Sequence, residues 1–376
     1  MPGAPVSGNI GLCLAGGGAR GAYQAGVLRA VGQLTGSGAN PFSAITGVSV
    51  GAVNAAFLAC RADDFAGALE RLERLWCSLR PHDIYRTDAA SVLLCSLHWL
   101  TTLILPRLGW QTPQSLLNMG PFEALLQREI DFGNLERVID SGALTALAVT
   151  ASSYTDGRAK TFFQGHDSLE NWRRTRRDGY RTKLATEHVL ASTALPLVFR
   201  SRKIGGEYFG DGALRLTMPL SPAIRLGADR ILVVAARDES SESAAIVDKA
   251  PRLGDIVGYL LDVLFNDNLN ADLERLQRIN ETLSMVAREQ RRELSLREID
   301  VHLIRPSVDI RSIAAKHADA LPFTIKMLLR GIGAWGPDWR LASYLLFERD
   351  YCRELADLGY RDAMEDSETL LQFLKG

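Results

Sequence analysis

A serine between two glycines stands at the boundary of two predicted elements. Ser49 is the centre of Gly47-Val48-Ser49-Val50-Gly51, a G-x-S-x-G pentad that follows an apolar run at 42–45 and precedes a helix-forming run at 52–59. In a strand–turn–helix setting this pentad strains and exposes the serine, and the glycines leave room around it. The positive end of the following helix favours an anionic transition state beside the hydroxyl. The pattern predicts that Ser49 is a nucleophile, with Gly47 and Gly51 forming its turn.

Three successive glycines upstream form a second candidate site. A buried-strand pattern at 10–15 runs into Gly16-Gly17-Gly18-Ala19-Arg20-Gly21, and a helical stretch follows at 22–34. The spacing satisfies G-x-G-x-x-G, but a dinucleotide site also needs an acidic residue about 20 positions further on. Residues 31–48 contain no Asp or Glu, which excludes the nucleotide interpretation.

The same glycines suit another ligand. Backbone amides at a helix start can hold an oxyanion as readily as a phosphate. An ordinary tight turn is the alternative, but three glycines would be a costly way to build one. We therefore predict an oxyanion loop, whose residues are Gly16, Gly17, Gly18, Ala19 and Gly21.

An aspartate flanked by glycines is the third candidate. Asp211 lies in Gly210-Asp211-Gly212-Ala213, after a short extended segment at 206–209. Such an aspartate is commonly only a turn residue. A serine nucleophile needs a base, however, and a short loop at a strand end can hold one. We predict Asp211 as the base, with Gly212 and Ala213 in its loop.

Taken in order, these motifs resemble those of the patatin-like phospholipases. The matching motifs are G-G-G-x-R-G at 16–21, G-x-S-x-G at 47–51 and D-G-A at 211–213, and the stretch Ala191-Ser192-Thr193-Ala194-Leu195-Pro196 is also similar to one typical of the family. The resemblance covers roughly residues 10 to 235. One departure is Thr217, which stands near a position where the family often has Asn; it affects the loop behind the base and no catalytic position.

The resemblance implies a Ser–Asp dyad acting on phospholipids, lysophospholipids or related acyl esters. Ser49 would attack the ester carbonyl while Asp211 takes its proton, and the amides around Gly17, Gly18 and Ala19 would hold the oxyanion. Arg20 would add positive charge to that loop or, equally, serve as a local cap or ion-pair partner. Water would then release the acyl group.

Two other functions use the same residues differently. Acyl transfer to an alcohol needs only another acceptor for the acyl-enzyme. A catalytically silent lipid-binding scaffold is disfavoured because Ser49 and Asp211 are both present. No metal or organic cofactor is implied, since His, Cys and carboxylate ligands do not cluster in the sequence.

A histidine base would give a Ser–His–Asp triad in place of the dyad. In an α/β-hydrolase the histidine follows the acid in the chain, and only His302 and His317 follow Asp211. His302 lies in an alternating, strand-like segment and His317 in a predicted helix. Neither has the loop setting of a base, so the dyad is favoured and the triad stays open.

Composition is consistent with an intracellular enzyme. The 376 residues are 47% hydrophobic, and 43 basic residues nearly balance 44 acidic ones, which gives no general attraction to nucleic acid. Five scattered cysteines without C-x-x-C spacing favour a reducing compartment over disulfides or zinc. The first nine residues lack the pattern of a signal peptide. A cytoplasmic location is expected, and the sequence does not indicate an oligomeric state.

Strand and helix patterns alternate through the first two thirds of the chain. This alternation predicts a three-layer α/β/α fold with a mostly parallel central sheet, and the resemblance implies its patatin-like form. The strands are expected at 10–15, 42–48, 144–152, 161–164 and 230–235, and the helices at 22–34, 50–60 and 64–79. Both Gly16 and Ser49 then fall at the carboxyl ends of strands, where sites in such sheets belong.

A polar, turn-rich segment at 237–251 separates two parts of the chain. We expect a catalytic domain at 8–236 and a mainly helical extension at 237–376 that docks on the same core. Within the extension, helical patterns cover 256–283, 321–335 and 341–358, and 300–305 returns as a strand.

Two segments are candidates for peripheral membrane contact. Residues 92–105 are apolar but shorter than the roughly 20 residues that span a bilayer, so they are expected to form either a buried helix or an interfacial lid. Residues 173–183 carry six basic side chains, which suit phospholipid phosphates or, more often, an ordinary solvated loop.

Overall fold

The structure is a computed structural model of the whole chain. It describes residues 9–36, 38–86, 115, 117–196, 198–238, 250–291, 294, 296–336 and 338–375. The segment 92–105, expected to form a buried helix or an interfacial lid, therefore lies outside the described residues. Within them, no helix is both long enough and apolar enough to cross a membrane.

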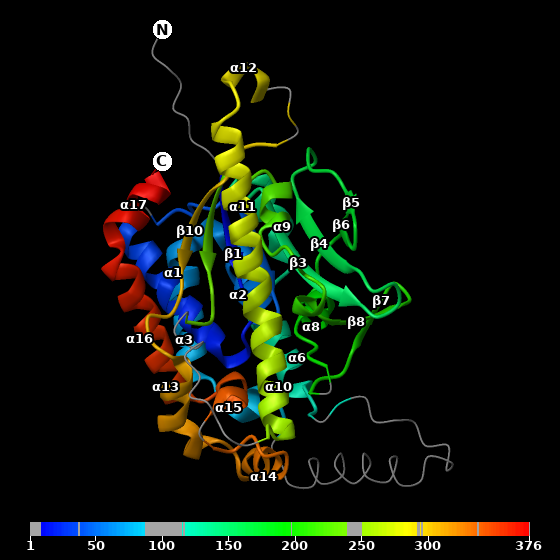
Figure 1. The fold of residues 1–376 in the computed structure, drawn as a ribbon, viewed down its shortest axis with the longest axis vertical. Helices are drawn as coiled ribbons and strands as arrows, with labels where there is room; N and C mark the ends of the chain where they lie inside the picture. Colours follow the sequence, from blue (N-terminus) through cyan, green and yellow to red (C-terminus); the bar gives the residue numbers. More distant parts are fainter. Residues whose placement is uncertain are drawn as a thin grey trace.

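A ten-stranded sheet organises the fold (Figure 1). Its strands are β1 (Ile10–Leu14), β2 (Ala44–Val48), β3 (Ala146–Ser153), β4 (Ala159–Gly165), β5 (Trp172–Arg174), β6 (Arg177–Arg181), β7 (Arg202–Ile204), β8 (Glu207–Asp211), β9 (Arg230–Val234) and β10 (Asp300–Ile304). The run β10-β9-β1-β2-β3 is entirely parallel. Antiparallel pairs join β3 to both β4 and β8 and form the hairpins β5–β6 and β7–β8. The predicted parallel core is confirmed. In the antiparallel flank, β4 and β8 correspond to the extended segments expected at 161–164 and 206–209, whereas sequence patterns did not indicate β5, β6 and β7.

Helices cover both faces of this sheet. They are α1 (Gly21–Thr35), α2 (Val50–Ala59), α3 (Phe65–Ser78), α4 (Pro81–Ile84), α6 (Gly120–Glu129), α7 (Gly133–Asp140), α8 (Thr186–Ser192), α9 (Ser221–Arg225), α10 (Leu253–Asp262), α11 (Asn268–Ser284), α12 (Arg288–Arg291), α13 (Ile310–His317), α14 (Phe323–Gly331), α15 (Arg340–Leu345), α16 (Arg349–Glu365) and α17 (Ser367–Lys375). The main core lies on the side of α1, α2, α3 and α16, and a smaller core lies beneath α9 and α11 (Figure 1). The predicted three-layer arrangement is thus confirmed.

Alternation along single strands explains these two cores. In β1, Leu12 and Leu14 face the main core, whereas Cys13 between them packs in the smaller one. Successive side chains of a strand point to opposite faces. A strand with apolar residues at every position is therefore buried on both sides, as expected for a parallel sheet.

Segments beyond residue 237 pack directly on this framework. Strand β10 extends the sheet by pairing with β9, and α16 packs along α1. The predicted helix at 256–283 is present as α10 and α11, joined by a π-helical turn, η6 (Val263–Asp267). The pattern at 341–358 is broken into α15 and α16, because Leu346 departs from helical geometry.

The basic segment at 173–183 forms most of a hairpin. Strands β5 and β6 pair antiparallel, and Arg176 in the turn between them has a φ of 61°. Asp178 is buried and forms an ion pair with Arg158. The run of charge is therefore part of the sheet edge and not a simple loop.

Candidate active site

Ser49 occupies a strained turn between β2 and α2. Its φ and ψ are 54° and −128°, outside the regions that residues with side chains usually adopt. The chain can make this turn because Gly51 brings α2 against β1: a Cβ at Gly51 would lie 2.1 Å from the carbonyl oxygen of Leu14. The predicted strand–turn–helix geometry around the serine is present.

A second serine holds this turn in place. The amide of Ser49 donates to Ser192 Oγ at 2.9 Å, and Ser192 Oγ donates to the carbonyl of Thr150 at 2.6 Å. Helix α8 and strand β3 thereby fix the backbone of the turn. Ser192 belongs to the 191–196 stretch noted in the sequence, but its contact with Ser49 could not be read from that motif.

The glycine loop lies at the end of β1, beside the turn. It continues into the short 3-10 helix η1 (Gly18–Arg20), and Gly18 has a φ of 57°. A Cβ at Gly18 would lie 2.4 Å from the carbonyl oxygen of Tyr344, so both conformation and space require glycine here. Among backbone hydrogen bonds of the described residues, none is donated by the amides of Gly17, Gly18 or Ala19. These amides are the unsatisfied donors of a helix start.

Buried amide side chains tie this loop to the helices below it. Gln24 Nε2 donates to the carbonyl of Ala15 at 2.8 Å, and Asn54 Nδ2 donates to Gln24 Oε1 at 2.9 Å. Trp76 Nε1 donates to Asn54 Oδ1 at 2.9 Å. The chain of bonds links α1, α2 and α3 and fixes the start of the loop relative to the serine turn.

Asp211 is the last residue of β8 and is only 1% exposed. Its Oδ1 accepts from the Ala213 amide at 2.9 Å, and its own amide donates to the carbonyl of Ala194. Burial raises the pKa of Asp211 to about 7, while the hydroxyl of Ser49 and the Ala213 amide act to lower it. Asp211 Oδ2 is buried without a hydrogen bond of standard geometry to any described residue. This oxygen is available to take a proton.

The loop behind Asp211 is held from the far side of the sheet. Thr217, the position that departs from the family pattern, is exposed. The loop is instead anchored by Leu220, whose amide donates to Asp272 Oδ2 of α11 at 3.1 Å. The unusual threonine therefore does not disturb the packing behind the aspartate.

Ser49, Gly18 and Asp211 line one apolar cavity with a volume of about 70 Å³. The cavity runs from Ser49 along α2. Its other walls are formed by α3, by α6 and by residues between 265 and 347. Its apolar lining includes Val50, Val53, Phe57, Phe265 and Tyr344. Phe265 of the π-helical turn also lies against Gly16. Phe265 and Tyr344 were not predicted to lie at the site, because nothing in their local sequence marks them.

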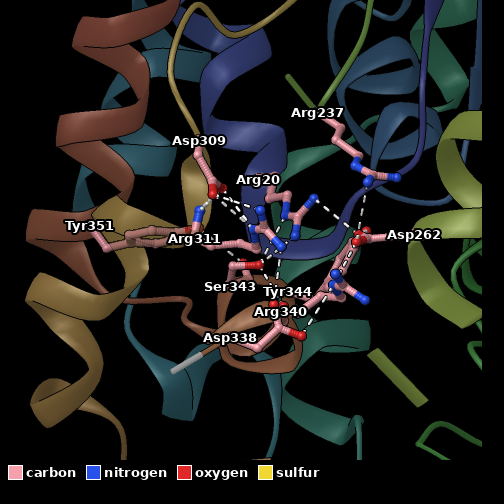
Figure 2. Close-up of polar contacts among 10 residues, drawn as sticks. All are labelled: Arg20, Arg237, Asp262, Asp309, Arg311, Asp338, Arg340, Ser343, Tyr344 and Tyr351. Atoms are coloured by element: carbon pink, nitrogen blue, oxygen red, sulfur yellow. Dashed lines mark hydrogen bonds and ion pairs between the residues drawn. The ribbon is translucent and has the colours of Figure 1, made fainter. Parts of the chain in front are cut away.

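Arg20 points away into a buried network of charges (Figure 2). Its guanidinium donates to Ser343 Oγ at 2.7 and 3.0 Å and stacks over the ring of Tyr344 at 3.9 Å. Asp262 lies 3.7 Å from it and accepts from the Tyr344 hydroxyl at 2.7 Å. The network continues through Arg237, Arg340, Asp338, Arg311 and Asp309. Arg20 therefore joins the glycine loop to the C-terminal helices.

No histidine lines the cavity among the residues that the structure describes. His302 lies on β10, forms an ion pair with Asp366 and packs against the ring of Phe373. His317 ends α13 and contacts Glu354. Both predictions of their local structure are confirmed. Over the described ranges, no group of three or more His, Cys, Asp or Glu side chains is arranged to hold a metal ion.

Comparisons with known proteins complete this description. Two solved structures match the chain at low sequence identity: VipD from Legionella pneumophila (TM-score 0.36, 13% identity, 96% of this chain and 67% of that chain) and the ExoU–SpcU complex from Pseudomonas aeruginosa (TM-score 0.27, 17% identity, 89% and 68%). A search of curated proteins gives no match. A family model described as Patatin-like phospholipase matches residues 12–224, which is more than half of the sequence and includes all three motifs. The chain belongs to the patatin-like phospholipase family.

Proposed function

We propose that this protein is a lipid acyl-hydrolase in which Ser49 and Asp211 form a catalytic dyad. The observation that carries the proposal is the state of Asp211: a buried carboxyl with one unbonded oxygen, whose pKa is influenced by the hydroxyl of a strained serine. A carboxyl titrating near neutral pH is a far better general base than an ordinary aspartate. Both groups face an apolar cavity suited to an acyl chain.

The reaction would proceed through an acyl-enzyme. Ser49 Oγ attacks the ester carbonyl as its proton passes to Asp211, and the oxyanion is held by amides of Gly17, Gly18 and Ala19. When the intermediate collapses, the ester C–O bond breaks and Asp211 returns the proton to the departing alcohol. Water, deprotonated by Asp211, then attacks the acyl-enzyme and releases the carboxylic acid. Gly16 and Gly21 would shape the loop, and Gly212 would complete the loop of the base.

The cavity indicates what kind of acyl group would fit. Val50, Val53 and Phe57 lie along one side of α2, and seven helical residues span about 10 Å. Aliphatic and aromatic side chains dominate the wall, so an unbranched apolar chain is favoured and a charged one excluded.

Arg20 has a positioning role in this proposal. Its guanidinium is occupied by Ser343, Tyr344 and Asp262, so it would fix the glycine loop and not contact the oxyanion. The proposed catalytic domain, 8–236, would then depend on the proposed extension, 237–376, for the order of its oxyanion loop.

The test compares three variants on a soluble nitrophenyl ester and on phospholipid vesicles. Ser49→Ala and Asp211→Asn should each lower kcat/KM by about 10³-fold or more, whereas His302→Gln should retain it. Labelling with a fluorophosphonate should be abolished in Ser49→Ala and much slowed in Asp211→Asn, because the reagent needs an activated serine, whereas His302→Gln should label like wild type. Thermal unfolding of each variant separates loss of the nucleophile from a general loss of folding.

Other outcomes contradict parts of the proposal. An inactive but folded His302→Gln would replace the dyad by a triad. Wild type that labels but forms an ester from an added alcohol, with no free acid, would be an acyltransferase. A folded wild type that binds lipid and neither labels nor turns over would be a binding protein.

A further inference from the structure

Helix α10 carries four large apolar residues on the outside. Leu253, Ile256, Tyr259 and Leu260 are each between 44% and 60% exposed. They fall within one arc of the helix, since residues three, four and seven apart share a face. These four are the exposed residues of α10, and neither of its carboxylates, Asp255 and Asp262, is among them.

The inward face of α10 is made of two glycines, Asp262 and the apolar Leu261. Gly254 fits against Ala334, and its amide donates to the carbonyl of Ile332 at 2.8 Å. One turn further on, Gly258 lies against the side chain of Arg340. Asp262 ends this face inside the charged network (Figure 2). The helix is therefore seated by its glycines, by Asp262 and by the core contacts of Leu261 and Val257, whereas the four outward apolar side chains take no part in seating it.

A neighbouring helix extends the exposed apolar surface. Phe323 and Met327 of α14 are both at least half exposed, and α14 meets the start of α10 through the Gly254–Ile332 bond. Figure 1 shows the two helices together at one end of the molecule. We call Leu253, Ile256, Tyr259, Leu260, Phe323 and Met327 the α10/α14 apolar face.

Two features specify what would cover this face. Basic residues Arg252, Lys326 and Arg330 lie on the same two helices or next to them, and an apolar face with basic and aromatic residues suits the headgroup zone of a membrane. In addition, α10 runs directly into the turn whose Phe265 lines the Ser49 cavity. The exposed apolar face and the cavity therefore belong to one continuous segment.

We propose that the α10/α14 apolar face docks the protein on a lipid surface, with the outward side chains of α10 inserted between headgroups. The choice of a lipid occupant rests on the proposed function, because a lipid hydrolase must reach substrate in an aggregate. This surface differs from both segments indicated by the sequence, 92–105 and 173–183.

The experiment measures binding to extruded phosphatidylcholine vesicles by flotation, in the full chain carrying Ser49→Ala. Tyr259→Glu combined with Leu260→Glu should weaken binding by at least about tenfold, because two half-exposed apolar groups no longer enter the interface. Met285→Glu is the matched control: this side chain is 86% exposed but lies at the opposite end of α11 (Figure 1). It should change binding by less than about twofold.

Salt separates this surface from the basic hairpin. Binding through apolar insertion should persist between about 0.1 M and about 1 M NaCl, where contacts to phosphates would be screened. Equal binding by the double variant and by wild type would overturn the proposal. So would a salt-sensitive interaction lost only on neutralising Arg173 and Arg174, or a dimer that Tyr259→Glu with Leu260→Glu dissociates.

The double variant is also prepared with Ser49 intact. Its hydrolysis of a soluble short-chain ester distinguishes the docking proposal from the proposed function. Retained ester hydrolysis with lost vesicle hydrolysis supports docking and proves the variant folded. Vesicle binding that depends on α10, in a protein that hydrolyses no ester, would contradict the proposed function and leave the docking surface intact.

Discussion

Two buried aspartates of this protein have opposite surroundings. Asp262 is 2% exposed and Asp211 is 1% exposed. Three arginines lie within 4 Å of Asp262, at 2.8, 3.7 and 3.7 Å, and the hydroxyl of Tyr344 donates to it. Asp211 forms no ion pair with any residue in the described ranges and accepts from one backbone amide. The two carboxylates are therefore equally buried, but one is paired with cations and the other is not.

The difference separates a part that holds the site together from a part that reacts. When a buried charge is surrounded by partners, removing either the charge or a partner lowers the stability of the fold considerably. A buried carboxyl without a cation is itself unfavourable in its charged form and takes up a proton readily. The C-terminal half contributes the first kind of group, and the sheet contributes the second.

Neutralising the paired aspartate gives the largest expected effect. Asp262→Asn should lower the free energy of unfolding by about 3–5 kcal/mol, because it leaves buried arginines without their counter-charge. The measurement is urea denaturation near neutral pH. Asp338→Asn is the control: Asp338 touches two of the same network's arginines but is partly exposed, so its loss should cost less than about 1 kcal/mol. Equal costs for both variants would remove the contrast.

Neutralising Asp211, the unpaired aspartate, should instead raise the free energy of unfolding. Asp211 has a pKa of about 7 in the folded protein, whereas in the unfolded chain its carboxyl releases the proton near its ordinary pKa of 3.8. Stability contributed by this group therefore falls as pH rises between about 4 and 7. Asp211→Asn removes that penalty.

The measurement is unfolding of wild type and Asp211→Asn at several pH values. The variant should be more stable by about 2–4 kcal/mol near pH 8. The gain should vanish below about pH 4, where the carboxyl is protonated in both states. A variant less stable than wild type at every pH would mean that the charged Asp211 has a partner after all.

The smallest effect is expected at Phe265, where the C-terminal segment packs against the glycine loop. Phe265 lies against Gly16 and packs on the ring of Tyr344 with centroids 5.5 Å apart. It lines the Ser49 cavity and also a smaller one beneath the glycine loop. Phe265→Ala should join the two cavities and raise the relative kcat/KM for branched over linear acyl esters by about three- to tenfold. Leu264→Ala, which borders only the smaller cavity, should leave the ratio unchanged.

Sequence patterns predicted the parts of the molecule that depend on local chemistry. The parallel strands, their helices and the patatin-like fold are confirmed. These features could be predicted because strand patterns and glycine turns depend on short stretches of sequence. The roles of Ser49, Asp211 and the glycine loop stay predictions, although the structure brings Ser49, Gly18 and Asp211 to one cavity.

Contacts between distant residues could not be predicted in this way. Ser49 and Ser192 are 143 positions apart, and Arg20 and Ser343 are 323 apart. Neither Ser343 nor Phe265 lies in a motif, and a serine or a phenylalanine in a helix is ordinary. Only the packing of the C-terminal helices gives them their partners.

The π-helical turn η6 has a consequence for the phase of the helices around it. A π turn holds one residue more than an α turn, and each residue of an α-helix turns the chain by about 100°. Deleting one residue from Val263–Asp267 would therefore leave an α turn and keep the phase of α10, whereas deleting a second residue would rotate α10 by that angle relative to α11. Asp262 would leave its arginines, and the outward apolar arc would be carried toward the protein interior. The count of residues in this turn therefore sets which side of α10 meets water.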